Sequence, residues 1–177
     1  MDGVRSGLVC VIDDPDPAFE RLRRIHDPHA ALGVPAHVTC LFPFVPPLLI
    51  DHAVAEALRD LASDFEAFTV LFPDVGEFPG VVWLRPEPEE PFRALTRAIV
   101  ARFPEYPPYE GAFDDPQPHM TLGMDLEPAD MARVRSAVDG EIVPRLPLRA
   151  AVSSLSLLIL DDTRHWHEAL RFPLGRA

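Results

Sequence analysis

The chain has 177 residues, of which 47% are hydrophobic, and this is enough to bury a core as one domain or as two packed lobes. No apolar run approaches the roughly 18 residues that a membrane helix needs, so we expect a soluble, cytoplasmic protein without a membrane partner. The net charge of −12 opposes binding to long RNA, because such binding depends on basic side chains that neutralise phosphates. The same charge does not oppose binding of a small phosphorylated molecule.

The first half of the chain alternates strand and helix patterns. Apolar and turn-forming residues predict, in order, a strand at 7–13, a helix at 17–25, a loop at 27–36, a strand at 37–42, a helix at 51–65, and strands at 66–72 and 80–86. Asp51 is the expected cap of the second helix, because its carboxylate can accept from the first free backbone N–H groups. Pro43 ends the strand before it, because proline cannot donate to a sheet ladder.

The second half continues in the same manner. It predicts a helix from Pro91 to Phe103, a loop at 104–118, a strand from His119, a helix at 128–143, and final strands at 152–160 and 166–172. No linker or shift of composition divides the chain, so residues 1–177 form one expected domain. Because short turn segments separate neighbouring strands, we expect an α+β fold of antiparallel sheets with helices on their outer faces.

A pattern of histidine, apolar residue, threonine and apolar residue occurs twice, at 37–40 and at 119–122. Side chains alternate between the two faces of a strand. His37 and Thr39 therefore share one face of the first copy, and His119 and Thr121 share one face of the second. The apolar partners point the other way, where they can be buried. Two such pairs are able to hold one small anion between them.

The surroundings of the two copies also repeat. The histidines stand 82 residues apart, close to half of the chain length. Apolar runs begin 31 and 44 residues after His37, and 33 and 47 residues after His119. A repeated spacing of this kind is typical of an internal duplication. We therefore expect two lobes that share one groove.

The loop at 104–118 leads directly into the second motif and carries two further candidates. Tyr109 is able to stack on a nucleobase. Asp114 is a candidate for orienting His119 or lining the groove, and the alternative is a turn former. Trp83, outside this loop, is expected in the core.

The remaining histidines and the cysteines have simpler interpretations. His165 and His167 share one face of a predicted strand, as a metal pair or as part of an exposed edge strand. No third ligand lies at zinc spacing, so we predict no metal site. His26 and His29 are interpreted as a helix end and a loop. The two cysteines lie in apolar runs and are expected to be buried free thiols, at positions Cys10 and Cys40.

Longer stretches around the two motifs carry a resemblance. Gly33–Thr39 runs into Leu41–Phe44, and Phe113–Asp115 leads to Pro118–Thr121. With the segment Phe68–Leu84 between them, these stretches resemble the two-histidine (2H) phosphoesterase superfamily and, within it, the bacterial 2′-5′ RNA ligase family. The resemblance spans nearly the whole chain.

The resemblance implies a bilobal LigT-like fold, with two pseudo-symmetric lobes of antiparallel sheet and outer helices around a central groove. It also implies chemistry on cyclic or 2′-5′-linked phosphodiesters that needs no metal and no cofactor. His37 and His119 would act as general acid and base, because histidine titrates in the range that both tasks require. Thr39 and Thr121 would donate hydrogen bonds to the non-bridging phosphoryl oxygens. Which histidine is the acid stays open, as does the choice between hydrolysis and ligation.

Two features depart from the family pattern. Gly123 and Met124 stand where some members carry an arginine able to touch phosphate, and Phe42, a candidate groove residue, stands where close relatives often have tyrosine. With the net charge, these changes favour a mononucleotide or another small phosphodiester, and short RNA ends stay open as partners. We expect a monomer. The alternative function is a catalytically silent nucleotide- or phosphate-binding module with the same groove.

Overall fold

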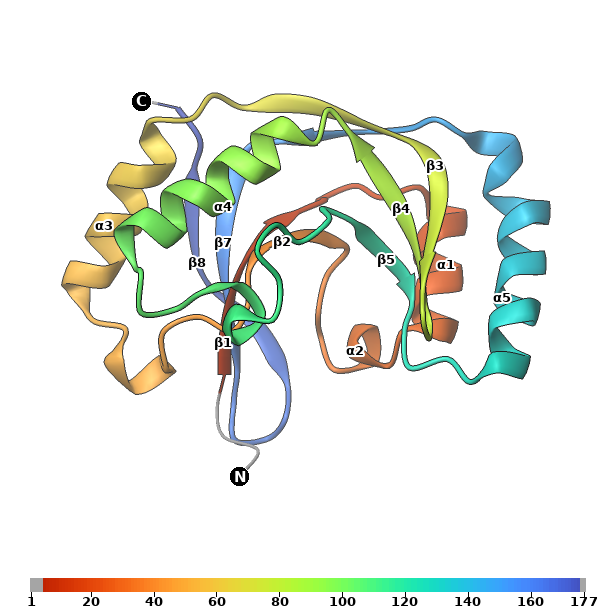
Figure 1. Cartoon of the computed structure of the whole chain (residues 1–177), viewed down its shortest axis with the longest axis horizontal. Coiled ribbons are helices and arrows are strands. Elements are labelled where there is room, and N and C mark those ends of the chain that lie inside the picture. The colour runs from red at the N-terminus through yellow and green to blue at the C-terminus, as the bar shows by residue number, and fades with distance from the viewer. Residues whose placement is uncertain (1–4, 176–177) are drawn as a thin grey trace.

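The computed structural model describes residues 5–175 (Figure 1). Its strands are β1 (Arg5–Val11), β2 (His37–Leu41), β3 (Phe68–Phe78), β4 (Val81–Glu87), β5 (Met120–Gly123), β6 (Leu148–Val152), β7 (Ser154–Leu160) and β8 (Trp166–Pro173). Its α-helices are α1 (Pro17–His26), α2 (Pro28–Ala31), α3 (His52–Ser63), α4 (Glu90–Arg102) and α5 (Pro128–Glu141). Within residues 5–175, no helix is both long and apolar enough to cross a membrane.

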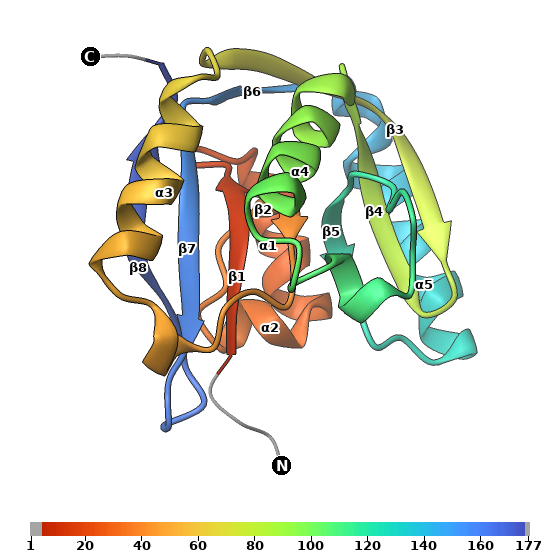
Figure 2. The ribbon, with the colours of Figure 1, turned by 60° about the vertical axis from the view of Figure 1, so that its left-hand side comes forward.

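The strands form two four-stranded antiparallel sheets, which confirms the predicted α+β class. Sheet A has the order β2-β1-β7-β8, and sheet B has the order β5-β4-β3-β6. Figure 2 shows β1, β7 and β8 to one side of the molecule and β3, β4 and β5 to the other. Sheet A therefore joins β1 and β2, from the first 41 residues, to β7 and β8, which lie between Ser154 and Pro173.

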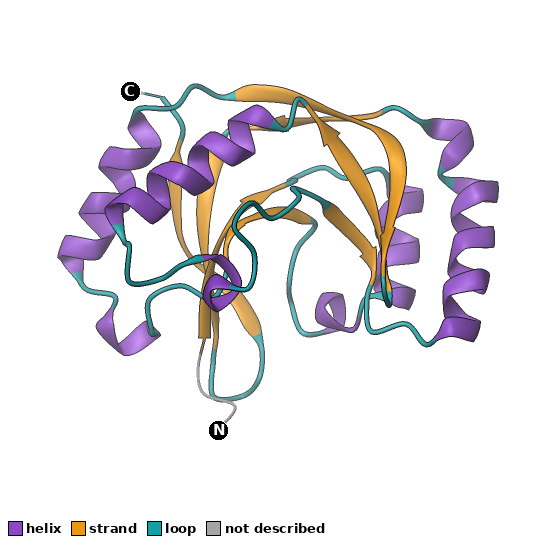
Figure 3. Ribbon diagram, in the orientation of Figure 1, coloured by secondary structure: helices purple, strands orange, loops and turns teal. Residues whose placement is uncertain are grey.

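Helices cover the outer side of each sheet, as Figure 3 shows. In sheet A, α4 packs on β2 and α3 packs on β8, while in sheet B, α1 packs on β5 and α5 packs on β4. The apolar stripes explain this placement: α1 buries Phe19 and Leu22, and α4 buries Phe92, Leu95 and Ile99. Each motif strand thus has one long helix behind it.

The two motif strands are edge strands that lie side by side, β2 in sheet A and β5 in sheet B. Along both strands the side chains alternate as the sequence predicts. Val38 and Met120 are buried at 0% and 2% exposure beneath α4 and α1, while Thr39 and Thr121 are half-buried on the opposite face. The burial of one face leaves the polar face of each strand for the space between the sheets.

The predicted loop at 27–36 contains a short helix, so that prediction was wrong for residues 28–31. Asp27 is the N-cap of α2, and its carboxylate accepts a hydrogen bond from the His29 backbone N–H at 3.0 Å. Pro28 occupies the first helical position, where its missing N–H costs nothing. Four residues are too few to show a helical period in sequence, but the cap and the proline are visible there.

The sequence also ends the strand before β4 at residue 72, and this is wrong, because β3 continues to Phe78. The pairing of β3 with β4 shifts register between Leu71 and Asp74, so Pro73 lies at a bulge where no ladder N–H is needed. The turn itself is confined to Pro79 and Gly80, and Gly80 adopts a φ of +76°.

A third correction concerns the run at 152–160, which the sequence presents as one strand. The structure divides it at Ser153 into β6, which pairs with β3 in sheet B, and β7, which pairs with β1 in sheet A. Apolar content alone does not reveal such a break, although burial alternates along β6 and is continuous from Ser154 to Leu158 in β7. Cys10 and Cys40 are free and buried, as predicted, and their sulfur atoms lie 3.5 Å apart.

Candidate active site

The two histidine and threonine pairs line one groove of about 270 Å³ between the sheets. β2 supplies His37 and Thr39, while His119 directly precedes β5 and Thr121 lies within it. The same groove contains both predicted aromatic candidates, Tyr109 and Phe42. Its other lining residues are Gly7, Val9, Asp27, His29, Val34, Met124, Leu158 and Trp166.

The two imidazoles are held by the same kind of contact. Nδ1 of His37 lies 2.7 Å from the Pro35 carbonyl oxygen, and Nδ1 of His119 lies 2.7 Å from the Gln117 carbonyl oxygen. A carbonyl oxygen can only accept a hydrogen bond, so each ring carries a proton on Nδ1 and donates it. Nε2 on the far side of each ring is left for proton transfer.

Both histidines are shifted toward their neutral form. Burial lowers the pKa of His37 to about 4, with the Pro35 carbonyl opposing the shift and the charges of Arg23 and His119 adding to it. Burial also lowers the pKa of His119, against the effect of the Gln117 carbonyl. Near pH 7 both rings are therefore neutral in the free protein. An anion bound between them would raise both pKa values by favouring the charged form.

Thr39 shares its surroundings with Tyr109. The Thr39 side chain hydrogen-bonds the Tyr109 hydroxyl, which opposes the rise that burial gives to the Tyr109 pKa. The Tyr109 backbone N–H donates to the Phe42 carbonyl at 2.6 Å, and Tyr109 has a φ of +49°, which is uncommon for a residue with a side chain. Backbone and side chain together thus fix this ring over the end of β2.

Aromatic rings stand on both sides of the groove. Phe42 and Trp166 meet edge to face at 6.0 Å between ring centroids on the side of sheet A. On the side of sheet B, Phe78 and Trp83 stack at 4.8 Å, and both also contact the His119 ring. Trp83 is buried, as expected, and it packs directly against one of the two motif histidines.

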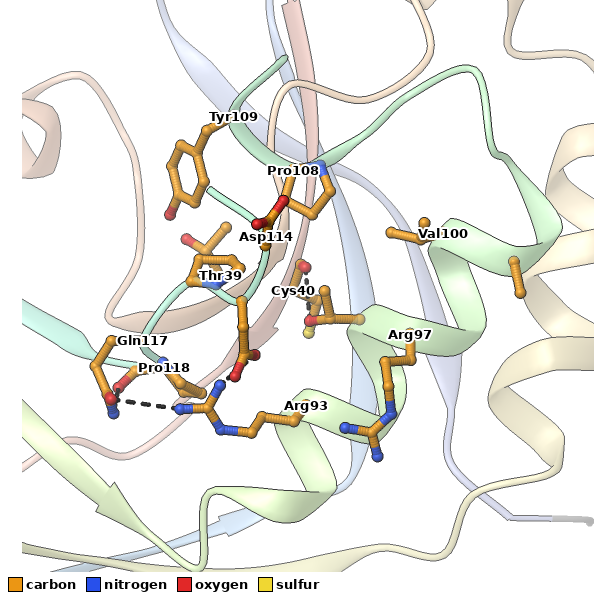
Figure 4. A pocket seen from close by; sticks show the side chains of 14 residues that line it. Thr39, Cys40, Arg93, Arg97, Val100, Pro108, Tyr109, Asp114, Gln117 and Pro118 are labelled. Carbon is orange, nitrogen blue, oxygen red and sulfur yellow. Dashed lines mark hydrogen bonds and ion pairs between the residues drawn. The ribbon is translucent and has the colours of Figure 1, made fainter. Parts of the chain in front are cut away.

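A second pocket, of about 290 Å³, adjoins the groove and shares Thr39 and Tyr109 with it (Figure 4). Asp114 lines this second pocket and is exposed. The residue that orients His119 is instead Gln117, through its carbonyl oxygen.

The Gln117 side chain is fixed by α4 and the residue before it. Gln117 Nε2 donates to Glu89 at 2.7 Å, and its side-chain oxygen accepts from Arg93 at 3.3 Å, the contact drawn in Figure 4. Arg93 is also paired with Glu89 at 2.9 Å and with Asp115. This network holds in place the carbonyl that sets the His119 tautomer.

Two of the groove residues that the sequence does not single out as site candidates carry functional side chains, His29 and Trp166. His29 was assigned to a loop, although Asp27 and Pro28 signal a capped turn that fixes its position. Trp166 was not singled out, although alternation places it opposite to His165 and His167, which are exposed in and beside the edge strand β8. Across residues 5–175, no three histidine, cysteine or acidic side chains gather as a metal-ligand set.

Comparison with known protein families shows which family the chain belongs to. A family model described as the 2′-5′ RNA ligase superfamily matches residues 12–164. The chain belongs to this superfamily. No curated protein matches its sequence. This membership agrees with the α+β fold of two antiparallel sheets.

Solved structures share the superfamily fold at low identity. TT0787 of Thermus thermophilus is 20% identical, with a TM-score of 0.63 over 98% of this chain and 100% of that one. LigT of E. coli complexed with 3′-AMP is 19% identical, with a TM-score of 0.57 over 97% and 98% of the two chains. LigT of E. coli complexed with NADP⁺ is 19% identical, with a TM-score of 0.55 over 99% of this chain and 100% of that one. These likenesses show that the bilobal fold implied by the motifs is present.

Proposed function

We propose that this chain is a phosphoesterase that opens 2′,3′-cyclic phosphodiesters, or cleaves and reversibly joins 2′-5′ linkages, in the groove between the sheets. One observation carries the proposal. Two histidine and threonine pairs from different sheets converge on one groove, and both rings keep Nε2 for proton transfer. Superfamily membership supports this class of reaction. LigT, which has the same fold, forms complexes with 3′-AMP and NADP⁺.

Opening a cyclic phosphate with water requires two proton transfers. A base removes a proton from water as the water oxygen bonds to phosphorus, and an acid protonates the sugar oxygen as its bond to phosphorus breaks. Neutral His37 suits the base, because its pKa is lowered to about 4 and its Nε2 keeps a lone pair over a wide pH range. His119 in its protonated form then suits the acid. A 5′-hydroxyl in place of water would open the ring by the same two transfers. His37 would remove the hydroxyl proton as its oxygen bonds to phosphorus, and His119 would protonate the released 3′ oxygen, which leaves a 2′-5′ linkage.

The threonines complete the site. Negative charge grows on the non-bridging oxygens of the phosphoryl group as water attacks. The hydroxyls of Thr39 and Thr121 stand on the same faces as the histidines, one on each sheet, and each is able to donate to one of these oxygens. The two threonines would thus bind the phosphoryl group from opposite sides of the groove.

The walls of the groove favour a nucleoside as the remainder of the substrate. Phe42, Tyr109 and Trp166 offer aromatic surfaces on which a base can stack. The volume of about 270 Å³ and the net charge of −12 suit a mononucleotide or a short end better than a long strand.

The test is turnover of 2′,3′-cyclic nucleotides and 2′-5′-linked dinucleotides, measured in the presence of EDTA because the proposed proton transfers need no metal ion. The wild type should form product. His37→Ala and His119→Ala should each reduce the rate by roughly 10²- to 10⁴-fold, the range that general acid and base catalysis contributes. His52→Ala, on the exposed face of α3, is the matched control and should keep the full rate.

Circular dichroism of each variant should match that of the wild type, so that lost turnover reflects chemistry. Equal rates in wild type and variants would refute the two-histidine mechanism. Saturable binding of a cyclic nucleotide with no product would instead favour the silent binding module.

A further inference from the structure

The proposed site has little positive charge with which to attract a phosphate. The chain has a net charge of −12, and no arginine from residues 5–175 lines the groove. His37 and His119 are held toward their neutral forms. A phosphodiester is an anion, so its capture calls for a cation inside this groove.

His29 is the third histidine of the groove, and it is held differently from the other two. Its Nδ1 lies 3.3 Å from the Asp27 carboxylate, rather than against a backbone carbonyl. The same carboxylate oxygen accepts from the His29 backbone N–H at 3.0 Å. Asp27 therefore fixes both the main chain and the ring of His29, whose side chain remains 41% exposed.

A buried arginine supports this pair from behind. Arg23 lies 3.1 Å from Asp27, and their side chains are only 2% and 4% exposed. Within the described residues, these are the charged side chains that are buried. Arg23 also donates to the Val34 carbonyl at 2.7 Å, directly before the Pro35 that orients His37. Burying charges is costly unless they are paired, so this network is a specific construction around the groove.

The groups around His29 favour its protonated form. Its hydrogen bond to Asp27 raises the His29 pKa, and the negative charges of Asp27 and Asp125 act in the same direction. Burial and the charge of Arg23 oppose the shift without cancelling it. His37 and His119 share the groove but have shifts of the opposite sign. Near neutral pH, His29 is thus the histidine of the groove that most readily carries a charge.

We propose that His29, held by Asp27 and Arg23, is the cation that binds the substrate's phosphoryl anion in this groove. It acts in binding and takes no part in proton transfer. This inference rests on the proposed function, because the anion in question is the phosphoryl group of the cyclic nucleotide. It assigns the electrostatic part of recognition to a residue outside the two motifs.

The direct test is the affinity for 2′,3′-cyclic AMP, whose single charge does not change between pH 5.5 and 8.5. Calorimetry on the His37→Ala/His119→Ala double variant avoids turnover and leaves His29 as the titrating histidine among the groove residues. Affinity should fall as pH rises through the raised pKa of His29. Adding His29→Gln should weaken binding about tenfold at pH 6, as expected for loss of a charge-assisted hydrogen bond, and remove the pH dependence.

Two further variants make the result specific. His29→Arg should keep the affinity without its pH dependence, because arginine stays charged. His52→Gln, an exposed histidine on α3, should behave like the parent. Unchanged affinity with His29→Gln at pH 6 would overturn the proposal.

Turnover by the otherwise wild-type protein separates this inference from the proposed function. His29→Gln should raise KM about tenfold and change kcat by less than about threefold, since uniform binding affects KM alone. A loss confined to kcat would place His29 in proton transfer and overturn its binding role. Absence of turnover in the wild type would refute the proposed reaction, whereas turnover with an unaltered His29→Gln variant would refute only the role of His29.

Discussion

His37 and His119 have equivalent hydrogen bonds but unequal pKa values. Burial brings the pKa of His37 to about 4 and lowers the pKa of His119 from its ordinary value of 6.5. The proposed reaction needs one neutral and one protonated ring at the same time. In the free protein this combination is most populated at acid pH, between the two pKa values.

We therefore predict an acidic optimum for kcat/KM with a cyclic nucleotide. The value should decline as pH rises through the lowered pKa of His119, by about tenfold per pH unit once this histidine is deprotonated, and should also decline toward pH 4 as His37 becomes protonated. The profile of kcat should lie at higher pH, because bound phosphate favours the charged rings. Steady-state rates between pH 4 and 9 provide the measurement. A kcat/KM that rises up to pH 9 would contradict this assignment.

At the scale of residues, the sequence predicts which side chains share a face, because alternation along a strand is a geometric rule. The burial of Val38 and Met120, and the half-exposure of Thr39 and Thr121, follow that rule. The role of His29 does not follow from it. That role depends on Arg23, a buried residue of α1 that supports Asp27 from behind the groove, where no apolar pattern predicts a charged side chain.

At the scale of elements, the hairpin of β3 and β4 supports one of the two histidines. Trp83 pairs with Gly76 across the hairpin and with Thr121 on the other side. Its ring lies over Gly76, so close that an added Cβ would come within 2.3 Å of it. The same ring contacts His119 at 5.8 Å between centroids. A glycine on β3 thus makes room for the aromatic side chain that backs His119.

Gly76→Ala should therefore destabilise the protein by about 1 to 3 kcal/mol, the usual cost of overpacking a filled site, and should lower turnover by displacing Trp83 from His119. Gly140→Ala is the matched control, because an added Cβ in α5 meets nothing within 4 Å. It should be neutral or stabilising by up to about 1 kcal/mol, since alanine favours helix. Urea unfolding of both variants measures the difference. Equal stability of the Gly76→Ala and Gly140→Ala variants would show that the Trp83 ring shifts at no cost in stability.

Long elements with a clear period could be predicted from sequence, whereas the joints between them could not. The stripe of Phe92, Leu95 and Ile99 predicts α4, and all three residues are buried. The bulge at Pro73 and the break at Ser153 depend on which partner strand lies alongside. Such pairing is a tertiary property, and hydrophobic content does not encode it.

At the scale of the whole molecule, each sheet draws on distant parts of the chain. Sheet A needs β7 and β8 to complete β1 and β2, and sheet B takes β6 from the segment directly before β7. Helices α1 and α4 also cross between the halves of the chain. Helix α1, from the first half, packs on β5, and α4, from the second half, packs on β2. That the two motifs arose by duplication remains a proposal, and the topology shows only that their surroundings interlock.

We predict that the two sheets unfold together. The chain has two tryptophans, and each reports on one sheet: Trp83 on sheet B and Trp166 on sheet A. Single-tryptophan variants, made by Trp83→Phe and Trp166→Phe, should give fluorescence transitions in urea that coincide with circular dichroism, as two-state unfolding requires. Separate midpoints for the two reporters would indicate lobes that fold independently.

The position of β7 has a consequence for synthesis of the chain on the ribosome. β1 and β2 are made early, yet the central neighbour of β1 begins only at Ser154. Until that segment emerges, the nascent chain exposes an apolar, half-paired sheet of the kind that is prone to aggregate. His37 and His119 have been translated by then, but the groove that they line has not yet formed. The groove that holds the proposed catalytic histidines is therefore complete only after β8 has been made, because Leu158 and Trp166 line it. We expect a nascent chain that stops earlier to be inactive.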